Sequence, residues 1–385
     1  MKGEAVSVTE ISPTARRARL GAIGENVDLG RLLLQGRAFF ALIVIVVVFS
    51  LLSPHYFTVA NFLTMAAHVA IFGILAIGML LVILNGGIDL SVGSTLGLAG
   101  VIAGFLMQGV TLRAFGVILF PPVWVVAVLT CALGAFVGLV NGVLIARFKV
   151  PAFVATLGVM YVARGVGLLI TNGLTYNNLA GRPDLGNTGF DWLGFNRLLG
   201  VPIGVVVLAI VAIIGSIVLN RAPFGRWLYA SGGNERAAEL SGVPVKFVQV
   251  TVYVLSGICA AVAGLILSSE LTSAGPTAGL SYELTAIAAV VIGGAALTGG
   301  RGTIRGTLLG AFVIGFLSDG LVIIGISSYW QTVFTGAVIV FAVLLNAIQY
   351  RRRVKPAGST DGPSTSQQQG GAAQQADPAS EKAAG

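Results

Sequence analysis

The chain has 385 residues, of which 56% are hydrophobic and only 10% are charged, and its mean hydropathy is +0.92. Soluble domains carry about 25% charged residues, so this composition excludes a water-solvated globule. The net charge is +8, but most Lys and Arg residues fall in segments expected on one side of a membrane, which excludes a nucleic-acid patch. The predicted fold class is therefore an all-α polytopic membrane protein.

Residues 1–37 are polar, and we expect them to form a cytoplasmic N-terminal segment rather than a secretory signal, whose apolar core would begin sooner. The apolar runs that follow predict about ten transmembrane helices. They cover residues 38–53, 68–84, 92–110, 121–146, 152–171, 201–219, 247–268, 283–297, 306–325 and 329–349. Residues 54–67 are expected to be an external loop or an interfacial segment.

An even number of spans places both termini on one side, and the basic residues indicate that this side is the cytoplasm. The predicted membrane domain is 38–349. Its expected cytoplasmic loops are 147–149, 220–246 and 301–305, and its expected periplasmic loops are 111–113, 172–200 and 269–282. Residues 350–385 begin with a basic exit, RRRVK, and continue as a tail rich in Gln, Ala, Gly and Ser, which we expect to be a disordered cytoplasmic segment.

Two segments of the chain resemble each other, and this similarity suggests two related halves. VILNGGIDLSVGSTLGLAG at 82–100 is similar to VVIGGAALTGGRGTIRGTLLG at 290–310 when a short gap is allowed. Paired half-repeats are common in transporters, and the substrate path lies between them. Glycine-rich apolar sequence also produces such similarity by chance, so both explanations stay open.

The segment 231–245 is a polar island between two apolar runs and predicts a helix of about two turns. Asn234 can cap its start through a side-chain oxygen. Gly242 can close its end, and Pro244 prevents the helix from continuing. Its charged residues are Glu235, near the positive end of the helix dipole, and Arg236 and Glu239, which can pair. The segment is either a docking element for a partner or a well-capped surface loop.

Several catalytic motifs are absent from the sequence. It has no G-x-x-x-x-G-K-[ST] phosphate loop, no Cys/His cluster with metal-ligand spacing, and no Ser, His and carboxylate set in a nucleophile context. Cys131 and Cys259 lie in apolar runs and are expected to be packing residues. We therefore expect no enzyme activity, no metal site and no cofactor in this chain; ATP hydrolysis would reside on another polypeptide.

NGGIDLSVGS at 85–94 is a second informative stretch, because it places Asp89 and Ser91 at or near membrane depth. A carboxylate at that depth is costly and therefore indicates function. A structural alternative is that Asp89 caps the helix that follows. The two interpretations are compatible.

Arg164 lies in the middle of a predicted span and must face a wet cavity or a carboxylate, for which Asp319 and Glu283 are the candidates. His55 and His68 are too isolated in the sequence to be assigned as ligands. Other hydrogen-bonding side chains in or near the spans could contact either a neighbouring helix or a substrate. The candidates are Asn85, Asn141, Thr156 and Tyr161.

The chain resembles the permeases of ribose/xylose/galactose-type ABC sugar importers from about residue 40 to residue 349. Four motifs in the same order carry this resemblance. They are NGGIDLSVGS at 85–94, NGVLIARFKVPAFVATLGVM at 141–160, GGNERAAELSGVPV at 232–245 and YELTAIAAVVIGGAALTGGRGTIRGTLLGAFVIG at 282–315. The resemblance does not extend to the first 37 residues or to the tail.

The resemblance implies a bacterial inner-membrane permease that is embedded in lipid and works as two copies. Its partners would be a cytoplasmic ATPase that binds ATP and Mg²⁺, and a periplasmic sugar-binding protein. The resemblance further implies that residues 232–245 contain the coupling helix on the ATPase. The contact residues would be Gly232, Gly233, Asn234, Glu235, Arg236, Glu239 and Gly242.

The cargo implied by the resemblance is a monosaccharide or polyol, and the mechanism is alternating access. Related permeases carry nucleosides, autoinducers or branched-chain amino acids, so another small solute is an alternative. A secondary carrier coupled to protons or sodium is a further alternative. It would need ionisable groups in the spans, and only Asp89, Arg164 and Asp319 are candidates.

Overall fold

The structure is a computed structural model, and it describes residues 37–112, 116–327, 329–338, 340 and 344. The predicted tail at 350–385 lies outside the described residues, as does the predicted N-terminal segment 1–37 except for the backbone of its last residue. The described part is mainly helical, with short strands in the connections. This confirms the predicted all-α class.

The predicted apolar runs up to residue 325 overlap helices, although the run predicted to end at residue 297 is helical only as far as Ile292, because the glycines at 293 and 294 end the helix. These helices are α3 (Arg37–Leu52), α4 (Val59–Leu84), α5 (Val92–Met107), α6 (Val123–Ala146), α7 (Ala152–Thr171), α9 (Ile203–Asn220), α12 (Val245–Leu271), α13 (Tyr282–Ile292) and α14 (Ile304–Ile323). Six of the described helices, α4, α6, α7, α9, α12 and α14, are long and apolar enough to cross a membrane. Residues 329–338 are also helical. The chain is therefore built as a polytopic membrane protein.

The predicted boundary between residues 54–67 and the second span is wrong. Helix α4 begins at Val59, because the side chain of Thr58 accepts a hydrogen bond from the backbone N–H of Asn61. Only residues 53–58 lie outside helices in this part of the chain. The polar side chains of this stretch suggested a loop, although a capped first turn tolerates them.

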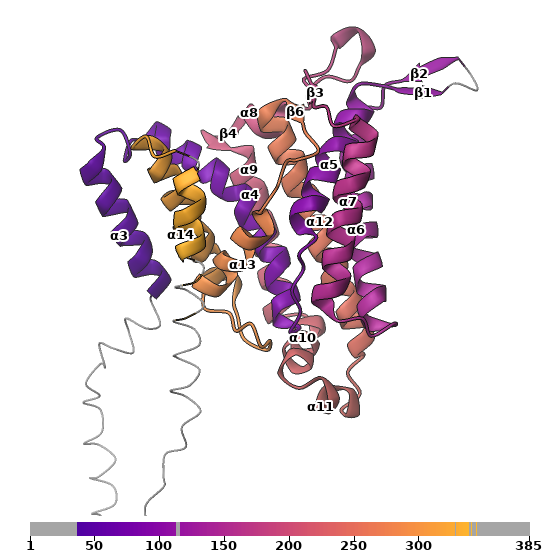
Figure 1. Cartoon of the computed structure of the whole chain (residues 1–385), viewed down its shortest axis with the longest axis vertical. Coiled ribbons are helices and arrows are strands. Elements are labelled where there is room, and N and C mark those ends of the chain that lie inside the picture. Colours follow the sequence, from indigo (N-terminus) through magenta and orange to yellow (C-terminus); the bar gives the residue numbers. More distant parts are fainter. Residues whose placement is uncertain (1–36, 113–115, 328, 339, 341–343, 345–385) are drawn as a thin grey trace, which may run out of the picture. The chain divides into compact units, whose positions relative to one another are not determined.

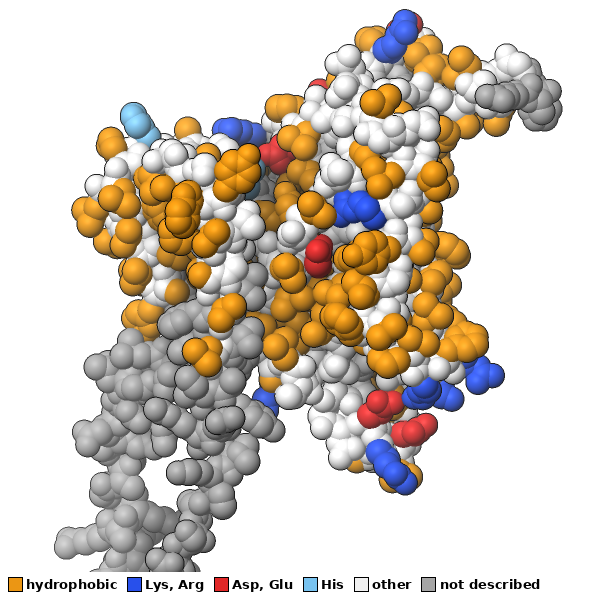
Figure 2. All heavy atoms as spheres, viewed as in Figure 1, with side chains coloured by type: hydrophobic (Ala, Val, Ile, Leu, Met, Phe, Trp, Pro, Cys, Tyr) orange, Lys and Arg blue, Asp and Glu red, His pale blue; other side chains and the backbone are white. Residues whose placement is uncertain are grey.

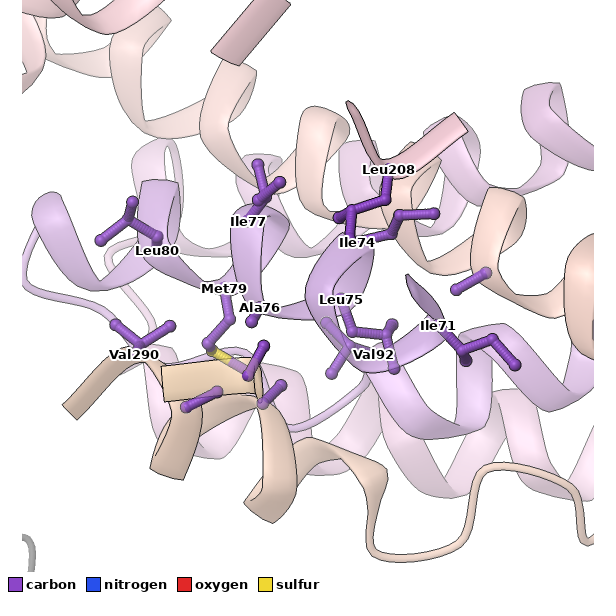
Figure 3. Close-up of a cluster of buried hydrophobic side chains, with 14 of the residues drawn as sticks. Ile71, Ile74, Leu75, Ala76, Ile77, Met79, Leu80, Val92, Leu208 and Val290 are labelled. Carbon is purple, nitrogen blue, oxygen red and sulfur yellow. The ribbon is translucent and has the colours of Figure 1, made fainter. Parts of the chain in front are cut away.

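Helix α4 forms the centre of the packed core. From Val69 to Leu84 it is apolar on all sides, which is the pattern of a helix buried among other helices. Figure 3 shows its side chains meeting Leu208 of α9, Val92 of α5 and Val290 of α13. The α4 residues labelled in that view are Ile71, Ile74, Leu75, Ala76, Ile77, Met79 and Leu80. These helices therefore surround α4 and fix its position.

Helices α6 and α12 pack with their backbones in close approach. A side chain at Gly134 would overlap the carbonyl oxygen of Gly257, and one at Gly138 would overlap that of Tyr253. Small residues at such crossings allow van der Waals contact between helices in a lipid environment, where apolar burial gives little driving force. This accounts for part of the high glycine content.

Short elements gather at the two ends of the helices (Figure 1). One end carries the antiparallel pairs β1–β2, β3–β6 and β4–β5 together with α8 (Trp192–Phe195). The strands are β1 (Val110–Leu112), β2 (Val117–Leu119), β3 (Tyr176–Asn177), β4 (Arg197–Leu198), β5 (Val201–Pro202) and β6 (Ser273–Ala274). A 3₁₀ turn covers Pro183–Leu185. The loops predicted to be periplasmic, 172–200 and 269–282, are thus joined by the β3–β6 pair.

The opposite end carries α10 (Pro223–Gly233) and α11 (Glu235–Leu240). The loops predicted to be cytoplasmic meet there, because Lys149 contacts Glu235 and Tyr229 contacts Gly302. Figure 2 shows hydrophobic side chains over the middle of the visible face, with most charged side chains nearer its ends. This distribution is the one expected for helices that cross a bilayer.

Candidate functional site

Helix α11 forms where the sequence predicted it. Asn234 adopts an extended backbone conformation, and its Oδ1 accepts a 3.0 Å hydrogen bond from the backbone N–H of Ala237. Gly242 has a φ of +83°, the left-handed conformation that closes the helix end. Pro244 then precedes the first residue of α12. The predicted capped helix of 231–245 is therefore confirmed.

The surface of α11 combines charge with one large exposed apolar side chain. Glu235, Arg236 and Glu239 are exposed, and Nζ of Lys149 lies 3.3 Å from Oε1 of Glu235. Leu240 is 83% exposed although it ends the helix beside these charged groups. Apolar side chains with a polar rim are typical of contact surfaces. Sequence reasoning missed Leu240; the signal was a leucine in an otherwise small and charged helix.

Helix α10 was also missed, because residues 220–246 were interpreted as a single capped loop. Pro223 at its first turn is compatible with a helix start. The hydroxyl of Tyr229 donates a 2.8 Å hydrogen bond to the carbonyl oxygen of Gly302, and burial raises the pKa of this phenol. Helix α10 is thereby attached to the turn that precedes α14.

The end of α10 meets the end of α4 in a junction formed by Ser231, Gly232, Asn85, Leu84 and Gly300. The Ser231 hydroxyl donates a 3.0 Å hydrogen bond to Oδ1 of Asn85. The backbone N–H of Gly300 donates to the carbonyl oxygen of Leu84 at 2.9 Å. A side chain at Gly232 would overlap that same carbonyl oxygen, whereas one at the neighbouring Gly233 would meet open space. The similar segments 82–100 and 290–310 thus lie together beside α10.

Asp89 lies next to this junction, in the turn between α4 and α5, and is only 1% exposed. Its Oδ1 accepts hydrogen bonds from the backbone N–H of Ser91 at 3.0 Å and from the Ser91 hydroxyl at 2.6 Å. Its Oδ2 accepts from the Ser256 hydroxyl at 2.9 Å. The N-cap position of α5 is occupied by Ser91, so the interpretation of Asp89 as the cap residue itself is wrong. Asp89 instead ties this turn to α12, which supplies Ser256.

Two further predicted residues converge on the same turn from neighbouring helices. Asn141 of α6 donates from Nδ2 to the Ser91 hydroxyl at 2.8 Å. Thr156 of α7 donates to the carbonyl oxygen of Ile88 at 3.2 Å or to that of Ala152 at 2.9 Å. Asn141 and Thr156 are fully buried. The structure therefore brings five of the seven predicted pathway residues to one turn: Asn85, Asp89, Ser91, Asn141 and Thr156.

Tyr161 and Arg164 lie apart from this turn, further along α7. Tyr161 is 69% exposed. Nη1 of Arg164 donates to the carbonyl oxygens of Pro276 at 2.7 Å and Ala278 at 2.8 Å. The predicted alternatives for Arg164 were carboxylates; of these, Glu283 is close enough to interact electrostatically, whereas Asp319 contacts a different residue.

That residue is His68, which the sequence had left unassigned. Its Nδ1 lies 3.1 Å from Oδ1 of Asp319, and its Nε2 lies 3.4 Å from Oε1 of Glu270. The three side chains come from α4, α14 and α12. This cluster could not be found from spacing, because its members are far apart in the chain. Among the residues that the structure describes, no group of three His, Cys, Asp or Glu side chains could hold a metal ion.

Comparison with known proteins gives consistent similarities over most of the chain. A family model described as "Branched-chain amino acid transport system / permease component" matches residues 61–343. The ribose import permease protein of Haemophilus influenzae is 41% identical over 320 residues, which cover 83% of this chain and 95% of that protein. The ribose import permease protein of Bacillus subtilis is 45% identical over 309 residues, covering 80% of this chain and 91% of that protein.

A relative with a different sugar in its name is also similar. The galactose/methyl galactoside import permease protein of Escherichia coli is 34% identical over 326 residues, which cover 83% of this chain and 96% of that protein. No solved structure gives a significant match to the chain. The family match at 61–343 therefore includes both the 231–245 segment and the turn around Asp89.

Proposed function

The chain belongs to the family of branched-chain amino acid transport permease components, and we propose that it is the permease of an ABC importer for a monosaccharide or polyol. The observation that carries this proposal is the similarity, over four fifths of the chain, to permeases named for ribose import. The chain is a multi-pass inner-membrane protein, in agreement with the six helices among its described residues that are able to cross a membrane.

In this proposal the chain supplies the path, and ATP hydrolysis occurs on a separate cytoplasmic subunit that binds ATP and Mg²⁺. The exposed α11 docks on that subunit through Glu235, Arg236, Glu239 and Leu240. The arrangement is supported by the position of α11 at the end where the basic loops gather. Asn234 and Gly242 shape this contact by setting the start and the end of α11, and Gly232 and Gly233 precede it as the last residues of α10.

Movement of α11 reaches the membrane helices through α10. The Ser231–Asn85 and Tyr229–Gly302 hydrogen bonds connect α10 to both similar segments of the chain. The turn at 85–91 is held by Asp89, Ser91, Asn141 and Thr156. A displacement of α10 would therefore shift this turn, and we propose that the path for the cargo runs beside it and along the α7 face with Tyr161 and Arg164.

The finer topology belongs to the same proposal. Ten spans in two related halves, with both termini in the cytoplasm, would place 220–246 inside and 172–200 outside. Helices α6 and α7 are mostly unburied within the chain, which leaves surface for a second copy of the permease as well as for lipid. A periplasmic binding protein would deliver the cargo to the end that carries the β3–β6 pair.

Uptake into proteoliposomes tests the proposal. The purified chain would be reconstituted with its ATPase and binding protein, and uptake of labelled ribose, xylose, galactose, a polyol, a nucleoside and leucine would be compared. We expect ATP-dependent uptake of one sugar or polyol. Uptake driven by a proton or sodium gradient without ATP would instead establish a secondary carrier, and ATP-dependent uptake of leucine or a nucleoside alone would refute the sugar class.

A further inference from the structure

A cavity of about 750 Å³ lies between the end of α9, helix α10 and the start of α14. The side chains of Ile213 and Ile217 form part of its apolar wall, and Arg221 and Arg305 form part of its basic rim. It lies at the end of the helices that carries α10 and α11. The cavity is separate from the turn at 85–91.

The basic rim of this cavity is not neutralised by the chain itself. Arg221 and Arg305 are exposed, and within the described residues neither guanidinium makes an ion pair or a side-chain hydrogen bond with another side chain. No Asp or Glu is found among the described residues that line the cavity. The hydroxyl of Tyr229 is already used in its bond to Gly302. Two unpaired guanidinium groups on the rim of one cavity attract an anion, and the planar donors of arginine suit a phosphate group.

The wall of the cavity also favours a ligand with an apolar part. Ile210, Ile213 and Ile217 are 51%, 60% and 52% exposed, and their spacing of three and four residues places them on one face of α9. This stripe leads from the cavity into the middle of a helix that can cross the membrane. A soluble anion would use only the rim, whereas a lipid would use the rim and the stripe together.

We propose that this cavity binds the phosphate headgroup of an anionic phospholipid of the cytoplasmic leaflet, with an acyl chain along Ile210, Ile213 and Ile217. Basic pockets between helices at the cytoplasmic surface are suited to such lipids. A carboxylate of a soluble partner is the competing occupant, but it would leave the isoleucine stripe unexplained. The bound lipid would contact both α10 and α14 and would therefore hold α10 in place. The inference rests on the position of the chain in the membrane and not on the transported solute.

Lipid binding to the purified full-length permease tests this proposal without any transport measurement. The probes are phosphatidylglycerol and phosphatidylcholine with identical acyl chains, with inorganic phosphate and glycerol 3-phosphate as soluble probes. Native mass spectrometry would measure retained lipid, and thermal unfolding would measure stabilisation. We expect phosphatidylglycerol to bind and stabilise the wild-type chain more than phosphatidylcholine. We expect Arg221→Gln/Arg305→Gln to weaken phosphatidylglycerol binding about 30-fold, because each arginine near a membrane surface strengthens binding about fivefold and the variant removes two.

Arg226→Gln/Arg301→Gln is the matched control, because it removes the same charge from exposed residues outside the cavity lining. If both double variants bound phosphatidylglycerol equally weakly, the assignment of the lipid to this cavity would be refuted. If inorganic phosphate or glycerol 3-phosphate stabilised the wild-type chain as much as phosphatidylglycerol does, the bound phosphate would come from a soluble molecule and not from a lipid. Unchanged lipid binding with loss of ATPase co-purification in Arg221→Gln/Arg305→Gln would show a protein contact instead. If that variant does not fold, equal binding of the two lipids by the wild-type chain would still refute the proposal.

Discussion

His68 Nδ1 lies 3.1 Å from Asp319 Oδ1, although 251 positions separate the two residues in the chain. The contact joins α4 to α14, and Glu270 of α12 approaches the other ring nitrogen at 3.4 Å. Polar groups between membrane helices are costly when unpaired. The cluster therefore links three helices at the end opposite α10 and α11. Its polar side chains serve as partners for one another.

His68→Ala should destabilise the chain by about 1 to 3 kcal/mol, because it leaves two carboxylates without a hydrogen-bonding partner. Thermal unfolding of the purified protein measures this change. His55→Ala is the control, since His55 is exposed near the start of α4. In a double-mutant cycle, Asp319→Asn should cost less in the His68→Ala background than alone. Equal stability of the two histidine variants would contradict the linking role.

The comparison of His68 with Asn234 shows what the sequence could predict. The cap of α11 is a contact between residues three positions apart, so Asn234, Gly242 and Pro244 were enough to predict it. The partners of His68 come from helices far along the chain, and local patterns carry no information on which helix faces meet. For the same reason Asp319 was considered as a partner for Arg164, which bonds to backbone carbonyl oxygens instead. Apolar runs predicted the helices because burial in lipid imposes their length and composition.

Glu235→Lys and Glu239→Lys should leave membrane insertion intact but weaken co-purification with the ATPase and ATP-dependent uptake. Both residues are exposed on α11, and a lysine at 235 would also face Lys149. Asp184→Lys is a matched charge reversal at an exposed site at the other end of the helices. Unchanged co-purification and uptake in both glutamate variants would count against docking through α11.

Leu240→Ala should weaken ATPase binding by about tenfold, because truncating a central apolar contact residue costs more than about 1 kcal/mol. The stability of the permease alone should not change, since the side chain is 83% exposed. Titration of the purified ATPase into permease in detergent measures the affinity. Leu199→Ala, at a leucine that is 98% exposed at the opposite end, is the control. Similar affinities in the two variants would exclude Leu240 from the contact.

Gly232→Ala should separate ATPase binding from transport. The added methyl group would overlap the carbonyl oxygen of Leu84, so α10 would have to move away from the end of α4. The exposed face of α11 is not altered, and co-purification with the ATPase should therefore persist while uptake falls. Gly233→Ala is a closely matched control, because its methyl group would meet open space. Normal uptake in Gly232→Ala would show that the junction does not transmit the movement.

Asp89→Asn should lower stability by about 1 to 3 kcal/mol, because an amide nitrogen would replace one of two oxygens that each face hydrogen-bond donors. Ser256→Ala should cost less, since it removes one donor and leaves the Ser91 bonds in place. Thermal unfolding and the KM and kcat of uptake distinguish the two roles open to Asp89. Loss of stability with unchanged KM supports a positioning residue for the 85–91 turn. A raised KM with unchanged stability would instead place its carboxylate in direct contact with the cargo, which its burial among protein donors argues against.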